Sequence, residues 1–204
     1  MNLAMIMVLV DLVLGPALTM LVFRPAKPSL RFDLGVIALV QLSALVYGVM
    51  SIYQARPVYV AYVVDRFEMV SAADLEPALL AKAAAPFNRF PDRAPSWVHV
   101  ELPRDRQELD KLTMAEALNG TGPALLPELY QAFDGRTALA KAKPVANLRE
   151  FNEVGQVDRA LAALGRDDDQ VRYLPLHAIG RDMTVFVSAE NGEVLEVADL
   201  RPWS

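Results

Sequence analysis

The sequence predicts a two-part α+β protein. Residues 1–56 are expected to form a transmembrane helical hairpin, and residues 57–204 a domain with a mainly antiparallel sheet and several helices. Two long apolar runs open the chain, strand-like alternation occurs near both ends of the remainder, and helical spacing separates these strands without a regular strand-helix-strand rhythm. The composition agrees, because 53% apolar residues and a mean hydropathy of +0.23 are unusually high for a protein without membrane segments.

The apolar runs span about 3–23 and 34–55, and each is long enough to cross a hydrocarbon core of about 30 Å. Residues 24–33 between them hold two prolines and three cations, which predicts a turn that neither helix absorbs. A signal peptide is the alternative for the first run, but it lacks a basic start and a small-residue cleavage site. The cations place the turn in the cytoplasm, so residues 57–204 of a bacterial protein are expected in the periplasm. The N-terminus then lies outside without a cation or signal to export it, which suggests a further transmembrane helix upstream.

Several residues in the apolar runs are candidates for contacts between helices. A carboxyl group at membrane depth costs about 2.5–3.5 kcal/mol, so Asp11 is expected to face protein. It either contacts another transmembrane helix or accepts a hydrogen bond from Tyr47 in the second run. Gly15 and Gly48 allow close helix approach, and Pro16 is expected to bend the first helix.

The domain begins with a predicted strand over 58–65 that continues as extended chain through 67–70. A helix is expected from Ser71, because Ser71 and Asp74 have the spacing of a capping box. Further predicted elements are a loop over 86–96, a strand over 97–103, a helix over 104–118 ended by Asn119–Gly120, helices over 145–151 and 157–164, a strand over 171–176, and a hairpin over 182–200 with a type I′ turn at Asn191–Gly192.

Neither a catalytic nor a metal-binding motif emerges from the sequence. The chain has no cysteine, which excludes disulfides, thiolate metal sites and thiol catalysis. His99 and Glu101 are spelled like a zinc-deaminase motif but lie on a predicted strand, so an exposed strand face is expected instead. Asp167–Asp169 lack the ligand spacing of a calcium loop and indicate a solvated loop. Trp203 is typical of a core-filling side chain, with a partner anchor as the alternative.

The charge is divided unevenly between the two parts. Residues 1–56 sum to +2, so residues 57–204 carry −7 of the total of −5. Such an acidic domain repels a phosphate backbone, which argues against nucleic acid as a partner.

The residues from Val10 to Gly48, followed by the segment 55–75, resemble the membrane half of the type IV pilin accessory (fimbrial assembly) proteins of Gram-negative bacteria. The segment 172–203 is similar to the C-terminal block of that family. Family members typically have one more N-terminal transmembrane helix, in agreement with the topology argument. The motif positions carried over are Asp11, Gly15, Pro16, Arg31, Asp33, Gln41, Asp65, Arg66 and Phe67.

The resemblance implies a multi-pass protein of the bacterial inner membrane, with a periplasmic C-terminal domain, that assists pilus assembly or dynamics without catalysis or a cofactor. Its implied partners are the major type IV pilin, other pilus assembly proteins and the lipid bilayer. We expect pilin contacts or helix packing through Asp11, Gly15, Pro16, Tyr47, Gly48, Asp65, Arg66 and Phe67. The alternative is a membrane-anchored periplasmic sensor or ligand-binding module, which a deep apolar pocket with converging polar groups would favour.

Overall fold

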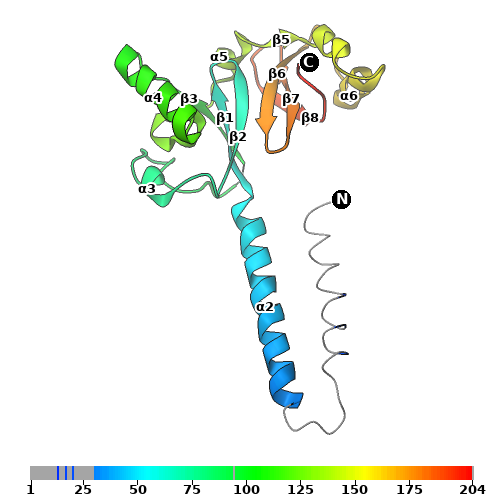
Figure 1. The fold of residues 1–204 in the computed structure, drawn as a ribbon. Coiled ribbons are helices and arrows are strands. Elements are labelled where there is room, and N and C mark those ends of the chain that lie inside the picture. The colour runs from blue at the N-terminus through cyan, green and yellow to red at the C-terminus, as the bar shows by residue number, and fades with distance from the viewer. Residues whose placement is uncertain (1–12, 14–16, 18–19, 21–29, 94, 204) are drawn as a thin grey trace. The chain divides into compact units, whose positions relative to one another are not determined.

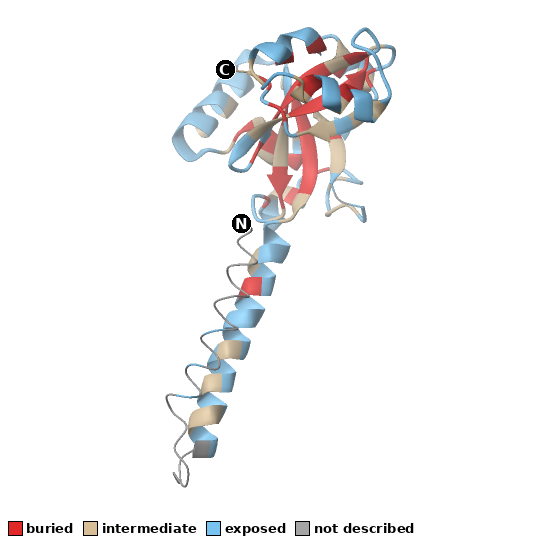
Figure 2. Ribbon diagram, turned by 90° about the vertical axis from the view of Figure 1, so that its right-hand side faces the viewer, coloured by how far each residue is buried: buried red, intermediate tan, exposed pale blue. Residues whose placement is uncertain are grey.

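The computed structural model describes residues 13, 17, 20, 30–93 and 95–203, and its contacts divide the chain into two units, 1–56 and 57–204. In the first unit, helix α2 (Leu30–Gln54) is apolar on all sides. It is mostly exposed, as the largely pale blue ribbon of this helix in Figure 2 shows. It is the described helix that is long and apolar enough to cross a membrane. Most of the predicted first span, including Asp11, Gly15 and Pro16, lies outside the described residues.

The start of α2 corrects the sequence prediction. The helix begins at Leu30 and includes Arg31, Phe32 and Asp33, whereas the sequence predicts a turn over 24–33. Asp33 lies in the first turn of the helix, where a carboxylate interacts favourably with the free backbone N–H groups. Both prolines of the predicted turn, Pro25 and Pro28, precede Leu30, so they do not prevent the helix from beginning at Leu30.

The second unit is built on a curled, eight-stranded sheet with the order β4-β3-β1-β2-β6-β7-β8, to which β5 adds on β6 (Figure 1). Pairing is parallel for β1–β3 and β2–β6 and antiparallel for the other five pairs. The predicted α+β class with a mainly antiparallel sheet is therefore confirmed. The strands are β1 (Pro57–Val63), β2 (Arg66–Ser71), β3 (Ser96–Val100), β4 (Tyr130–Ala132), β5 (Lys143–Pro144), β6 (Val171–Ala178), β7 (Arg181–Ser188) and β8 (Val194–Ala198).

Strand β1 is apolar throughout because both of its faces are buried. Tyr59 and Ala61 point to one core cluster, whereas Val60 and Tyr62 point to a second. Strand β6 likewise serves two clusters, through Tyr173 on one face and Leu174 on the other. A central strand that is buried on both faces does not need alternating polar and apolar residues, which explains the continuous apolar sequence of β1.

Short helices cover parts of the sheet and connect its strands. They are α3 (Pro77–Leu80), α4 (Arg106–Asn119), α5 (Gly135–Leu139), α6 (Gln156–Leu164) and the 3₁₀ helices η1 (Pro123–Leu125), η2 (Pro127–Leu129) and η3 (Val145–Glu150). The helix predicted from Ser71 is wrong over most of its length. The Asp74 carboxylate does accept bonds from the Ser71 N–H and hydroxyl at 2.9 and 2.6 Å. However, Glu76 is extended before Pro77, so the helix begins only there.

The hairpin turn at Asn191–Gly192 also differs from the predicted type I′ turn. Gly192 has a positive φ of 72°, but Asn191 does not, so the two positive values of that turn are not formed. Gly192 packs directly on Gly135, where a Cβ atom on either residue would collide with the backbone of the other. This contact brings the start of α5 against the β7–β8 loop and requires glycine at both positions.

Candidate partner-binding site at the β1–β2 turn

The β1–β2 turn carries two of the residues that the family resemblance indicates, Asp65 and Arg66. Instead of one continuous extended segment, the chain reverses here, with Val63 opposite Arg66 in the antiparallel register. Val64 has a φ of +56°, a region in which a β-branched residue is strained and glycine is usual. The Asp65 N–H donates to the Val63 carbonyl at 2.6 Å, and the buried Tyr62 hydroxyl donates to the Val64 carbonyl at 2.9 Å. The hydrogen bond from the buried Tyr62 side chain therefore fixes the strained turn to the core.

Phe67 directly follows this turn and is fully buried. Its ring contacts Trp97, Tyr62 and Phe133, with centroid distances of 5.0, 5.3 and 5.6 Å. A residue in this position cannot touch a partner in the folded domain. Phe67 instead fixes the point from which Arg66 and Asp65 reach the surface.

Arg66 connects the turn to the C-terminal segment. Its Nε lies 3.1 Å from Asp65 Oδ1, and its guanidinium lies 5.6 Å from the centre of the half-buried Trp203 ring. The Trp203 indole N–H donates to Asp182 Oδ2 at 2.7 Å, while the other oxygen of Asp182 lies 2.7 Å from His177 Nδ1. Trp203 is thus neither a core filler nor a free anchor but part of a polar surface cluster. Sequence reasoning missed this cluster, because its members come from three distant segments.

A groove of about 400 Å³ lies between the turn and helix α4. Its apolar lining comes from both sides: Val63 and Val64 from the turn, and Leu109 and Leu112 from α4, with Leu102 between them. At one end, Arg66, Glu68 and Glu116 also line a neighbouring hollow that extends to His177. The groove therefore joins an apolar floor to a charged end.

Glu68 gives that end its electrostatic character. It sits beside His177 in the parallel register of β2 and β6. Burial and the nearby Glu116 carboxylate raise the pKa of Glu68, although His177 and Arg66 act in the opposite direction. Two carboxyl groups thus share one end of the groove.

The helix wall of this groove is unusual, since α4 contains no buried residue. Both of its ends are capped. Gly120 ends the helix as predicted, with a φ of 73°, and at the start, which the sequence predicts at Arg104 without a cap, Asp105 accepts from the Glu108 N–H at 3.1 Å. Local capping supports α4, whereas packing against the sheet contributes little. Its exposed apolar residues include Met114 and Leu118, neither of which lines the groove.

The candidate residues in the first unit have different environments. Tyr47 is largely exposed on α2, whereas Gly48 beside it is buried. The proposed bond between Tyr47 and Asp11 lies outside the described residues, because Asp11 does. The structure therefore leaves this pairing a prediction.

The histidine of the sequence His99-Val100-Glu101, which is spelled like a zinc-deaminase motif, packs against an aromatic ring in the structure. His99 is not on an exposed face: its ring stacks on Tyr62 with centroids 5.6 Å apart, and its buried Nδ1 has no hydrogen-bond partner among the described residues. Within the part of the chain that the structure describes, no three His, Asp or Glu side chains converge to hold a metal ion.

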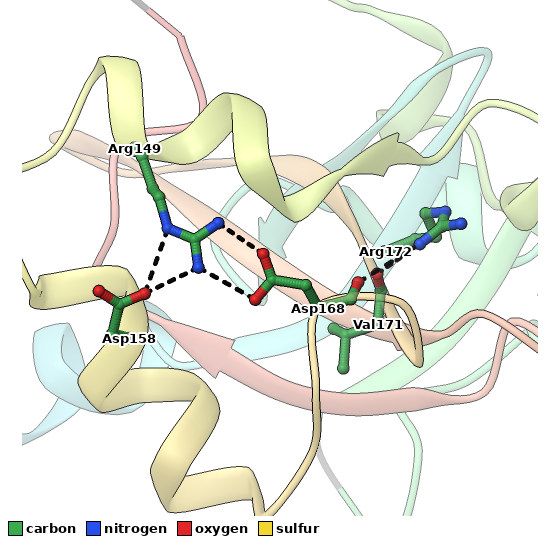
Figure 3. Close-up of polar contacts among 5 residues, drawn as sticks. All are labelled: Arg149, Asp158, Asp168, Val171 and Arg172. Atoms are coloured by element: carbon green, nitrogen blue, oxygen red, sulfur yellow. Dashed lines mark hydrogen bonds and ion pairs between the residues drawn. The ribbon is translucent and has the colours of Figure 1, made fainter.

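The acidic loop at Asp167–Asp169 is exposed to solvent, as predicted, and is also anchored by ion pairs (Figure 3). Arg149 of η3 donates from Nη1 and Nη2 to the Asp168 carboxylate at 2.5 and 3.0 Å. The same guanidinium donates to Asp158 on α6 through Nη2 and Nε. Hydrogen bonding to Arg149 lowers the pKa of Asp168. These carboxylates therefore tie the loop to two helices.

An open trough of about 710 Å³ lies along β8, with Trp97 and Phe133 among its lining residues. A ligand-binding module would bury most of a small molecule in a deep pocket with converging polar groups. An open trough does not provide that enclosure.

Comparison with curated proteins identifies relatives over most of the chain. A fimbrial assembly protein of serogroup I from Dichelobacter nodosus is 30% identical over 174 residues, which cover 82% of this chain and 67% of that protein. This chain belongs to the fimbrial assembly protein family. The serogroup E1 protein of the same organism is 29% identical over 174 residues, and the protein of serogroups C1 and C2 is 37% identical over 68 residues, or 32% of this chain. The predicted family resemblance is thereby confirmed. No family model matches the chain, and no solved structure does.

Proposed function

We propose that this protein is a membrane-anchored, non-catalytic accessory protein of type IV pilus assembly, which contacts pilin. The carrying observation is the extent of the similarity to the Dichelobacter proteins. It covers 82% of the chain, which is more than residues 57–204 alone contain, so it includes part of the apolar segment. Because the sequence similarity extends over part of the apolar segment as well as the domain, it supports a role in which the anchor and the domain act together.

The composition of α2 supports the anchor. Its 25 residues extend about 38 Å, enough to cross a hydrocarbon core of about 30 Å. The hydroxyl groups of Ser43 and Ser51 donate to backbone carbonyls four residues earlier, so neither needs water. Near its end, the Arg56 guanidinium lies 3.6 Å from the Tyr53 ring centre, a pairing suited to the lipid headgroup region.

The positive charges around residues 24–31 support a cytoplasmic position for that end of α2 and a periplasmic position for residues 57–204 in a Gram-negative cell. A pilin subunit that is still in the inner membrane would then meet the anchor in the bilayer and the domain outside it. Lipid provides no hydrophobic drive between helices, so the membrane contacts depend on close packing at small residues.

Deletion of the gene in its host, with complementation by the full chain, tests this role. We expect fewer surface pili or less twitching motility in the deletion strain, and recovery on complementation. Cross-linking in intact membranes should recover pilin with the full chain. Normal piliation in the deletion strain, together with no pilin in the cross-linked fraction, would overturn the proposal.

A further inference from the structure

The groove between the β1–β2 turn and α4 has a strained residue as one wall. Val64 occupies a backbone conformation that glycine would adopt without strain, yet its side chain is 57% exposed and lines the groove. Burial cannot account for valine here, because the fold gains little from so exposed a side chain. Strain retained at an exposed position points to a role outside the fold.

The opposite wall of the groove, helix α4, is also not stabilised by packing into the core. Helix α4 has no buried residue, but the side chains of Leu109 and Leu112 line the groove from one face. Caps at both ends maintain the helix. The two apolar walls thus stand at the surface on independently supported elements, which is a suitable arrangement for receiving an apolar group.

The charged end of the groove selects among possible occupants. Three of its four charged side chains are acidic, and the exception, Arg66, is paired with Asp65. Among the described residues, no salt bridge reaches Glu68 or Glu116. The groove therefore offers two carboxyl groups to a cation beside its apolar floor.

This charge argues against two other occupants. Anionic lipid headgroups would be repelled by the carboxyl groups. A second copy of this chain would bring together two domains of charge −7.

We infer that the groove binds a protein segment that carries a lysine or arginine within a few residues of an apolar side chain. The apolar side chain contacts Val64, Leu109 and Leu112, and the cation lies between Glu68 and Glu116. The inference rests on the proposed function only in taking a protein as the occupant.

Photo-cross-linking of the full chain in membranes of its host tests the inference. The photo-reactive residue p-benzoylphenylalanine replaces Leu112 in the groove or, as a matched control, Leu118 on the same helix but outside the groove. We expect several-fold more adduct from position 112, because only this position faces the proposed occupant. Peptide mapping should locate the adduct on a segment with the stated chemistry. Equal yields, an adduct with lipid or with a second copy, or an acidic segment would overturn the inference.

Substitutions separate binding from folding. Val64→Gly relieves the backbone strain, so we expect an unchanged or higher thermal midpoint but several-fold less adduct from position 112. Val154→Gly, at a fully exposed valine elsewhere, should leave the adduct unchanged. The double variant Glu68→Gln with Glu116→Gln should also reduce the adduct. Full adduct in both groove variants would overturn the inference.

These outcomes are distinguishable from those of the deletion experiment. An adduct of the stated chemistry on a protein unrelated to pili supports the groove assignment and contradicts the pilus role. A deletion phenotype with no adduct from position 112 contradicts the groove assignment alone.

Discussion

Helices α2 and α4 both expose nearly all of their side chains, but for opposite reasons. The side chains of α2 are apolar on every face, so water cannot be their natural surroundings. Helix α4 is mostly polar, with caps at both ends, and it needs no covering except where Leu109 and Leu112 line the groove. Exposure by itself therefore says little about a helix. Whether lipid, protein or water surrounds an exposed helix follows from the distribution of apolar residues around its axis.

The largest expected difference between the two helices concerns a new charge. Leu42 in the middle of α2 and Met114 on α4 are each 60% exposed, which makes them a matched pair. Leu42→Arg should cost about 2.5–3.5 kcal/mol on membrane insertion and shift much of the chain out of the alkali-resistant membrane fraction. Met114→Arg should change the free energy of unfolding by less than about 0.5 kcal/mol and leave membrane retention intact. Equal retention of both variants would break the comparison.

A smaller effect is expected from removing the cap of α4. Asp105→Ala deletes the acceptor of the Glu108 N–H and should cost about 1 kcal/mol, with faster amide hydrogen exchange throughout α4 because no buried residue holds the helix. Asp134→Ala is the control, since Asp134 caps α5, which also buries Ala138. Its loss should leave α5 better protected. Similar exchange in both helices would contradict the assignment of α4 as a capped but unpacked element.

The smallest expected effect concerns the charge of Glu68, which lies on β2 at one end of the groove. Because burial raises the pKa of Glu68, its ionised form destabilises the fold, and Glu68→Gln should raise the thermal midpoint at neutral pH. The gain should be below about 1 kcal/mol, since the site is partly screened by water. It should vanish as the pH falls below the ordinary carboxyl range, where Glu68 is neutral in both the folded and unfolded states. Glu196→Gln on the exposed face of β8 is the control.

Local signals predicted much of the secondary structure. Gly120 and Gly165 end α4 and α6 with φ values of 73° and 62°, and the C-terminal hairpin forms from the predicted segments. The predictions failed where a longer-range factor decided the conformation. The Ser71–Asp74 capping bonds formed without a helix because Pro77 forces the preceding residue to be extended. The Asn191–Gly192 loop adapted to the contact between Gly192 and Gly135.

The site was only partly accessible to sequence reasoning. The family resemblance indicated Asp65, Arg66 and Phe67, but not that Phe67 is buried while Arg66 lies over Trp203. Glu68, Glu116 and His177 carry no motif and come from separate elements. The positive φ of Val64 is equally invisible, because valine ordinarily indicates a strand rather than a turn.

The sequence by itself determined the division into an apolar anchor and an acidic domain, the α+β class, and the family. These properties follow from composition, short-range periodicity and stretches of similar sequence, which do not depend on how distant segments meet. Only the tertiary structure decided the strand order, the strained turn at Val64 and the groove beside α4. Those features arise from pairing between strands far apart in the chain and from side chains packed beneath the turn, so they exist only when the whole domain has folded.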